Sequence, residues 1–381
     1  MNEYQLQMPR QVYSGINAMQ ALARLAAGHH KAAVFTDKGI CASGIVQRPL
    51  AQLQTAGVEY RLFDELPAEP TCDQAQQVVD DFRKWGADMI VAVGGGSVMD
   101  VAKLASITAY GSCTVRELLD DASQGKKGVF TVMIPTTAGT GAEATPNSIV
   151  AVPEQQLKVG IVNPEMIADA VILDAEMIRR LPRAIAASTG VDTLCHAIEC
   201  YISAKANPFS DLFAMEALRL VFANLEAACD DPDNLEAKEK MLQAAFYGGV
   251  AITCSGTTAV HALSYPLGGR YHIPHGVANA MMLMPVMTFN LPACRQRLAQ
   301  VCDAVGAGNA GSETEKAQRV IQEMGRIVQH LGIPTSLAPY GVTEADLPVL
   351  VESGMAVQRL LVNNPRKVEP ADAEAIYRAV I

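Results

Sequence analysis

The chain has 381 residues, of which 50 % are hydrophobic and 18 % are charged, and its formal net charge is −10. The length favours two domains, and the composition is typical of a folded globular protein rather than a disordered chain. The acidic balance argues against a nucleic-acid partner, because nucleic-acid phosphates are bound by clustered Lys and Arg, and it favours a small-molecule partner instead.

The N-terminus and the cysteines predict a cytoplasmic protein. The stretch MNEYQLQMPRQVYSG lacks the basic start, apolar stretch and small-residue cleavage site of a secretory signal. Nine cysteines without CxxC spacing lie in apolar segments, as buried thiols of a reducing compartment do. Polar residues and prolines interrupt the apolar segments 244–260 and 276–292, so we expect core helices there and no membrane contact.

Short β-branched runs alternate with helix-length segments in the first half of the chain. Their order predicts βαβ units and a mostly parallel sheet. The predicted strands lie at 31–37, 60–66, 89–96, 129–137 and 170–177.

Near residue 180 the sequence changes character. The second half is rich in Ala, Leu and Met without strand patterns, which predicts an all-helical region. We therefore expect domains at 1–180 and 181–381. Pro182 suits the first turn of a helix, and Gly190 predicts a break before the next one.

A glycine-rich loop follows the predicted strand at 89–96. In VAVGGGSVMDVAK (91–103), three glycines separate a buried strand from a helix that is predicted to begin near Ser97. Such a backbone can approach a pyrophosphate closely, and the N–H groups of the helix start meet its charge. The loop lacks G-x-G-x-x-G spacing, so a plain glycine turn is the alternative to a nucleotide site.

Two other loops lie at strand ends in the same half. Asp37 ends the first predicted strand, where a carboxylate can accept hydrogen bonds from an adenosine ribose, although a turn-capping Asp is the alternative. The loop PTTAGTGAEAT (135–145) is dense in Thr and Gly and follows another strand. Because open α/β sheets bind ligands at the carboxyl ends of their strands, the three loops together favour a dinucleotide.

The second half contains residues suited to a metal site. Asp192 and His196 are four residues apart, so they share one face of a helix. His261, His272 and His275 cluster within VHALSYPLGGRYHIPHGVANA (260–280). One carboxylate and three imidazoles suit a divalent transition ion such as Fe²⁺ or Zn²⁺, whereas buried structural histidines are the alternative.

The segment between His261 and His275 is predicted to turn back on itself. We expect Pro266 and the glycines after it to end one helix, and a new helix to begin after Pro274. The intervening loop would bring His261 and His275 to one point.

With these motifs assembled, the sequence resembles the iron-containing alcohol dehydrogenases, whose superfamily includes glycerol dehydrogenase and dehydroquinate synthase. The resemblance covers nearly the whole chain. It implies an N-terminal α/β Rossmann-like nucleotide-binding domain, an all-α C-terminal helical domain, an active site between them, and a homodimer or larger oligomer. The segments that carry it are VAVGGGSVMDVAK, PTTAGTGAEAT, STGVDTLCHAIECY and HALSYPLGGRYHIPHGVANA.

The resemblance also implies roles for single residues. The residues that match the metal ligands of the family are Asp192, His196, His261 and His275. The residues that match its NAD-binding positions are Asp37, Gly95, Gly96, Ser97, Asp100, Thr136, Thr137, Thr140 and Lys158.

The chain departs from the family at the proton path. Many members have a His four residues after the third metal ligand, where it is thought to pass protons, whereas this chain has Tyr265. His272 is a spare imidazole that could replace it, and a plain loop histidine is the alternative.

The sequence therefore predicts an NAD(H)-dependent alcohol dehydrogenase or aldehyde reductase that requires Fe²⁺, or else Zn²⁺ or Mn²⁺. One alternative is an NAD- and metal-dependent lyase like the sugar-phosphate cyclases, which would need several basic residues where the motifs offer only Arg270. Another is a reductase of an anionic substrate such as a hydroxy acid or maleylacetate, which would also need a basic residue. A nucleotide sensor without turnover would leave the metal ligands unexplained.

Overall fold

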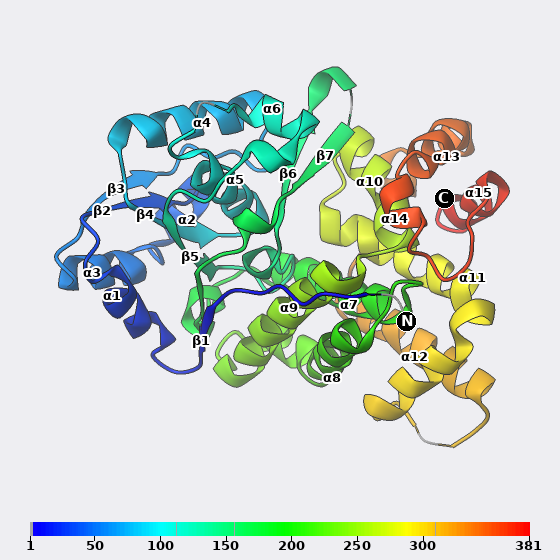
Figure 1. Ribbon diagram of the computed structural model, residues 1–381. Helices are drawn as coiled ribbons and strands as arrows, with labels where there is room; N and C mark the ends of the chain where they lie inside the picture. Colours follow the sequence, from blue (N-terminus) through cyan, green and yellow to red (C-terminus); the bar gives the residue numbers. More distant parts are fainter. Residues whose placement is uncertain (1–2, 112, 156, 309) are drawn as a thin grey trace. The chain divides into compact units, whose positions relative to one another are not determined.

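The structure is a computed structural model that describes residues 3–111, 113–155, 157–308 and 310–381. The chain divides into two compact units (Figure 1). The sheet unit is Gln7–Arg180, and the helical unit is Leu181–Ile381 together with the N-terminal residues up to Leu6. The N-terminal residues are tied to the helical unit by Tyr4, whose ring meets that of Phe209 edge-on at 5.4 Å.

A six-stranded sheet in the order β1-β8-β5-β4-β2-β3 forms the centre of the sheet unit, and all its neighbouring strands are parallel. Strands β6 and β7 form a separate antiparallel pair. The strands are β1 (Gln11–Ser14), β2 (Lys31–Phe35), β3 (Glu59–Phe63), β4 (Met89–Gly94), β5 (Phe130–Pro135), β6 (Asn147–Val152), β7 (Leu157–Val162) and β8 (Ala170–Leu173).

Short helices connect these strands. The α-helices of the sheet unit are α1 (Ala21–Ala26), α2 (Lys38–Ser43), α3 (Gln47–Thr55), α4 (Cys72–Trp85), α5 (Gly96–Thr108) and α6 (Val115–Asp120). Its 3₁₀ turns are η1 (Ala18–Gln20), η2 (Ala122–Gln124), η3 (Ala142–Ala144), η4 (Pro153–Gln155), η5 (Pro164–Met166) and η6 (Ala175–Ile178).

The strand order creates a ligand-binding position. From β2 the chain passes to β3 on one side, whereas β4 and β5 lie on the other side. The order therefore reverses between β2 and β4, and open α/β sheets bind ligands beyond the carboxyl ends of the strands at such a point. Every residue of β4 is buried, as expected for a central parallel strand.

The five predicted strands and the parallel sheet are confirmed, but the sequence reading missed β1, β6 and β7. Strand β1 has four mostly exposed residues at the sheet edge, so it carries no apolar pattern. Every second residue of β6 is buried, which is typical of a half-buried antiparallel strand rather than of the continuous apolar runs that identified the others.

Helices account for the regular structure that is described in residues 181–381, as predicted. The α-helices are α7 (Arg183–Ile202), α8 (Pro208–Asp230), α9 (Leu235–Ser255), α10 (Ala259–Tyr271), α11 (His275–Ala304), α12 (Glu313–His330), α13 (Leu347–Met355), α14 (Gln358–Leu361) and α15 (Pro370–Arg378). The 3₁₀ turns are η7 (Ala338–Tyr340) and η8 (Glu344–Asp346).

Two local predictions for the helical unit were wrong. Gly190 lies inside α7, where an added Cβ would stand 2.2 Å from Leu225 Cδ1, so this glycine allows close packing of α8 rather than a helix break. Pro266 lies inside α10, which continues to Tyr271. Tertiary contacts support the disturbed turn, since the Tyr377 hydroxyl donates to the Leu263 carbonyl at 2.7 Å.

Helix α11 is long and apolar enough to cross a membrane, but 56 % of its most apolar stretch is buried inside the protein. Its N-terminal end also carries His275 and Asn279 into the buried cluster described below. We therefore interpret α11 as a core helix.

Candidate metal centre

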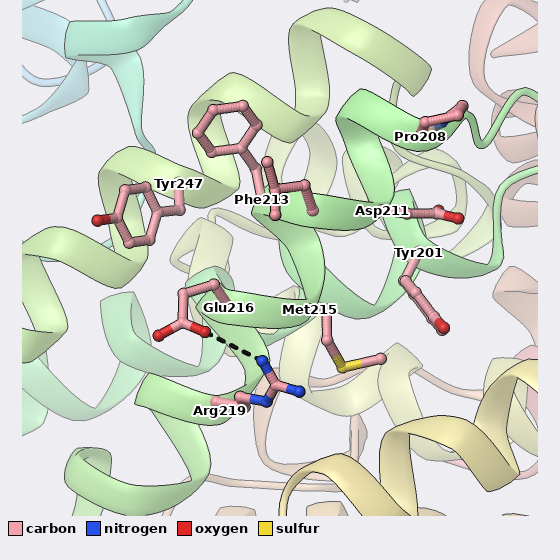
Figure 2. A pocket seen from close by; sticks show the side chains of 9 residues that line it. Tyr201, Pro208, Asp211, Phe213, Met215, Glu216, Arg219 and Tyr247 are labelled. Carbon is pink, nitrogen blue, oxygen red and sulfur yellow. Dashed lines mark hydrogen bonds and ion pairs between the residues drawn. The ribbon is translucent and has the colours of Figure 1, made fainter.

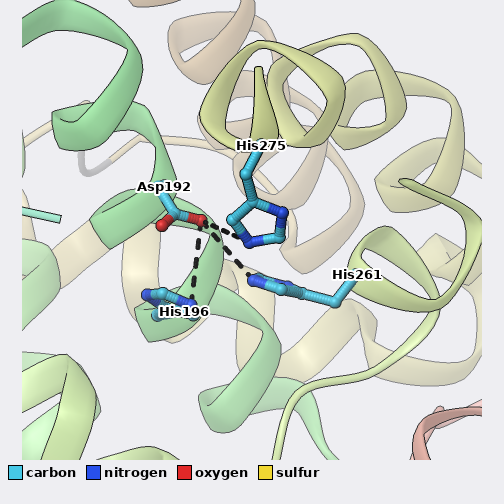
Figure 3. A group of neighbouring side chains, drawn as sticks. All are labelled: Asp192, His196, His261 and His275. Atoms are coloured by element: carbon cyan, nitrogen blue, oxygen red, sulfur yellow. Dashed lines mark ion pairs between the residues drawn. The ribbon is translucent and has the colours of Figure 1, made fainter. Parts of the chain in front are cut away.

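The structure brings Asp192, His196, His261 and His275 together (Figure 3). Their ligand atoms all lie within 4.8 Å of one another. Asp192 Oδ1 is the common point, at 3.7 Å from His196 Nε2, 3.5 Å from His261 Nε2 and 3.6 Å from His275 Nε2.

Three helices position these side chains. Asp192 and His196 occupy successive turns of α7, His261 lies in the first turn of α10, and His275 is the first residue of α11. Gly276 allows α11 to begin directly on α7, because an added Cβ would stand 2.1 Å from the Ser188 carbonyl oxygen.

The donor set fits a divalent ion. The distances of 3.5–3.7 Å from the imidazole nitrogens to Asp192 Oδ1 are too long for good hydrogen bonds. Ligand atoms bound at about 2.1 Å to one tetrahedral ion lie roughly 3.4 Å apart, which agrees with the observed spacing. Three nitrogens and a carboxylate oxygen also match the preference of iron and zinc.

Access to the cluster is uneven. The side chains of Asp192, His196 and His261 are 3 %, 7 % and 3 % exposed, whereas that of His275 is 37 % exposed. The cluster is therefore open on the side of His275.

Glu199, which the sequence reading missed, fixes the orientation of His261. This fully buried carboxylate contacts His261 Nδ1 through Oε2. Its Oε1 accepts hydrogen bonds from Thr258 N at 2.9 Å, Thr258 Oγ1 at 2.7 Å and Val260 N at 2.9 Å. Glu199 therefore caps the N-terminus of α10 and directs the proton of His261 to Nδ1, which leaves Nε2 for the ion.

Asn279 is a second missed residue. It is fully buried, and its Nδ2 lies 2.7 Å from Asp192 Oδ1 and 3.1 Å from Nε2 of both His261 and His275. An amide nitrogen has two protons, so it cannot donate to all three atoms at once. We assign it as the donor that orients the Asp192 carboxylate.

A sequence signal for both residues existed. Glu199 follows His196 by three residues and Asn279 follows His275 by four, so each lies on the face of the helix that carries a ligand. A polar residue on such an apolar, buried face needs a partner.

Burial and charge set the protonation of the histidines. Burial lowers the pKa of His196 to about 4, so this imidazole is neutral at pH 7. Burial also acts to lower the pKa of His261, but the charges of Glu199 and Asp192 outweigh it and raise the pKa to about 10. Binding of a cation must therefore displace a proton from His261.

In the sheet unit, the predicted glycine and threonine loops lie side by side. Gly95 caps α5, and Gly96 is its first residue. A Cβ on Gly96 would stand 3.1 Å from Thr140 Cγ2, and Thr136 N donates to the Gly94 carbonyl at 3.0 Å. A Cβ added to Gly95 would lie 3.6 Å from Thr137 Oγ1.

Asp37 lies just after the end of β2, the strand that pairs with β4 in the sheet. It caps α2 by accepting a hydrogen bond from Ile40 N at 2.9 Å. The capping role is therefore present in the structure, and the contact with a ribose remains a prediction.

The other predicted cofactor residues have protein partners. Asp100 is buried, accepts from Ile149 N at 2.9 Å and lies 3.5 Å from Lys103 Nζ. Glu69 links the remaining two, because its N–H donates to Ser97 Oγ at 3.1 Å and its Oε1 pairs with Lys158 Nζ at 2.6 Å.

The two predicted proton carriers differ in position. The ring of Tyr265 lies 6.1 Å from that of His275, and its hydroxyl accepts a hydrogen bond from Arg359 at 3.1 Å. His272 is the exposed C-cap of α10, with a left-handed φ of 54°.

A hollow of about 590 Å³ lies on the helical unit away from these residues (Figure 2). Tyr247, Phe213 and Met215 provide apolar walls, and Glu216 pairs with Arg219 at 3.3 Å. It includes none of the four metal-ligand candidates.

Comparisons with known proteins agree with this geometry. Residues 9–175 match the iron-containing alcohol dehydrogenase family model, and residues 186–381 match the model of the family's C-terminal region. Long-chain-alcohol dehydrogenase 1 of Geobacillus thermodenitrificans is 34 % identical over 351 residues, which cover 91 % of this chain and 88 % of that protein.

Solved structures give the same result. The crystal structure of a 1,3-propanediol oxidoreductase is 32 % identical, with a TM-score of 0.95 over the whole of both chains. Sulfoacetaldehyde reductase from Bifidobacterium kashiwanohense, in complex with NAD⁺, is 27 % identical, with a TM-score of 0.90 over 100 % of this chain and 99 % of that one. The resemblance seen in the sequence is confirmed, and the chain belongs to the iron-containing alcohol dehydrogenase family.

Proposed function

We propose that the protein interconverts a small alcohol and its aldehyde or ketone, with NAD(H) as the hydride carrier and a divalent ion held by Asp192, His196, His261 and His275. The observation that carries the proposal is the convergence of three imidazole Nε2 atoms on one Asp192 oxygen. Family membership favours Fe²⁺, and the same donors also suit Zn²⁺ or Mn²⁺.

The protein groups around the ion have separate tasks. When bound, the ion lowers the pKa of an alcohol hydroxyl and polarises a carbonyl. Glu199 holds the Nδ1 proton of His261, and Asn279 orients Asp192. Asp192, His196 and His261 are buried, so the substrate oxygen would approach from the side of the more exposed His275.

The sheet unit supplies the cofactor site. The free N–H groups at the start of α5, with Gly95 and Gly96, would hold the pyrophosphate, flanked by the threonine loop. Asp37 would accept hydrogen bonds from the adenosine ribose and so favour NAD over NADP. NAD(H), when bound there, would supply the hydride acceptor for alcohol oxidation and the hydride donor for the reverse reduction.

We assign proton transfer to Tyr265 rather than His272. The ring of Tyr265 packs near the accessible ligand His275. When an alcohol is oxidised, its hydroxyl proton would pass to the Tyr265 oxygen while the Tyr265 proton moves on to solvent, which leaves the tyrosine neutral.

We further propose a cytoplasmic homo-oligomer, a dimer or larger. The cytoplasmic location is supported by the cysteines, none of which forms a disulfide in the described residues.

The test is NADH formation at 340 nm with a panel of short alcohols, diols and hydroxy acids. Protein stripped by a chelator is given Fe²⁺, Zn²⁺ or Mn²⁺ separately without air. We expect metal-restored activity in the wild type, and none in His261→Ala, which should still bind NAD⁺. Turnover by a metal-free protein would overturn the proposal.

A further inference from the structure

The open side of the metal cluster leads to an arginine. Tyr265 lies beside His275 on this side, with its ring centroid 6.1 Å from that of His275. Arg359, on α14, donates to the Tyr265 hydroxyl at 3.1 Å, and its Cζ lies 5.7 Å from the Tyr265 ring centroid. Tyr265 therefore contacts both the Arg359 guanidinium and His275, the least buried of the four metal-ligand candidates.

Arg359 is exposed, and no carboxylate in the described part of the chain lies within 4.0 Å of it. Its guanidinium donates to the neutral phenol of Tyr265, which satisfies one of its five N–H donors. By contrast, Arg270, the basic residue singled out from the sequence, lies in the field of Asp346, to which Tyr271 donates at 2.8 Å. A guanidinium without an acidic partner beside a reaction centre is suited to bind an anion from outside the protein.

We propose that Arg359 binds a carboxylate or sulfonate at the end of the substrate remote from the reacting oxygen, and thereby selects short anionic aldehydes and the matching ω-hydroxy acids. The inference rests on the proposed function. The reaction is the reduction of the carbonyl, in which NADH supplies the hydride and solvent supplies the proton, giving the hydroxy acid and NAD⁺. The sulfoacetaldehyde reductase found among the similar structures is named for an anionic aldehyde of this kind.

The test compares two aldehydes of equal chain length, 4-oxobutanoate and butanal, as NADH-dependent substrates of the metal-loaded enzyme. We expect a higher kcat/KM for 4-oxobutanoate. Because a hydrogen bond to a charged group contributes about 1.5–3 kcal/mol, Arg359→Gln should reduce the ratio of the two kcat/KM values by roughly 10- to 100-fold. Arg359→Lys should restore part of the ratio, and Arg270→Gln is the matched control that should leave the ratio unchanged.

A second readout does not depend on turnover. Calorimetric titration with 4-hydroxybutanoate should detect binding to the wild type and weaker binding to Arg359→Gln. Equal kcat/KM values for the two aldehydes in the wild type, or an equal loss for both in Arg359→Gln, would show that Arg359 only holds Tyr265. Absence of turnover with either aldehyde and with every metal would instead contradict the proposed function.

Discussion

Glu199→Gln tests how the protein prepares its metal ligands. The Glu199 carboxylate accepts three hydrogen bonds at the start of α10 through Oε1 and faces His261 Nδ1 through Oε2. In Glu199→Gln, the three donors fix the amide oxygen at the Oε1 position, so the NH₂ group must face His261. The variant therefore keeps the helix cap but places a donor where His261 needs an acceptor.

The size of the effect follows from this reversal. With a donor opposite Nδ1, His261 must carry its proton on Nε2, the atom directed at Asp192. Loss of such a partner of a ligating histidine typically weakens metal affinity 10- to 100-fold, or about 1.4–2.7 kcal/mol. We expect a loss in this range while the fold is retained.

The assay is a competition titration of chelator-stripped protein with Zn²⁺ and a chromophoric chelator, with circular dichroism to verify folding. Thr258→Val is the matched control, because it removes one hydrogen bond to Glu199 Oε1 but leaves the contact with His261 intact. It should change metal affinity less than Glu199→Gln does. If folded Glu199→Gln bound Zn²⁺ as tightly as the wild type, the reasoning on His261 would be refuted.

Three other substitutions test separate parts of the molecule. Gly276→Ala should destabilise the protein by about 1–3 kcal/mol and weaken metal binding, because its Cβ would clash with the Ser188 carbonyl of α7. Gly269→Ala is the control, because nothing lies within 4 Å of its Cβ position, and it should change neither property. Thermal unfolding and Zn²⁺ titration measure the two effects. Glu143 is a buried residue of η3, and its burial raises the pKa of its carboxyl group from 4.5 to about 7. The wild type should therefore lose stability as pH rises through this interval, and above pH 7 Glu143→Gln should be about 3 kcal/mol more stable than the wild type. Urea unfolding at pH 5 and pH 8 measures this change, and parallel pH curves would contradict it. Asp37→Asn keeps the capping oxygen but removes the charge, so kcat/KM for NADPH relative to NADH should rise at least about tenfold, and an unchanged ratio would leave Asp37 as a cap alone.

The sequence by itself was sufficient to predict features that depend on a local pattern of residues. Central strands such as β4 read as continuous apolar runs because helices cover both faces of a parallel sheet. Asp192 and His196 could be paired because residues four apart share a helix face. The glycine loop could be placed because it follows such a strand directly.

The tertiary structure decided what depends on partners distant in the chain. Gly190 and Pro266 looked like helix breakers, but both lie inside continuous helices, where Gly190 packs against Leu225 and the Leu263 carbonyl near Pro266 accepts a hydrogen bond from Tyr377. The sequence does not show which residue Glu199 contacts, because its partner His261 lies 62 residues further along the chain and reaches it only when α10 packs in place.

The position of Arg359 illustrates the same limit. It lies 94 residues from Tyr265, so no periodicity in the sequence connects the two. Local spacing selects which residue types can form a site, because it reports on one helix or strand at a time. Which groups share a buried environment, and which charge is left without a partner, is settled only when helices from separate parts of the chain pack together.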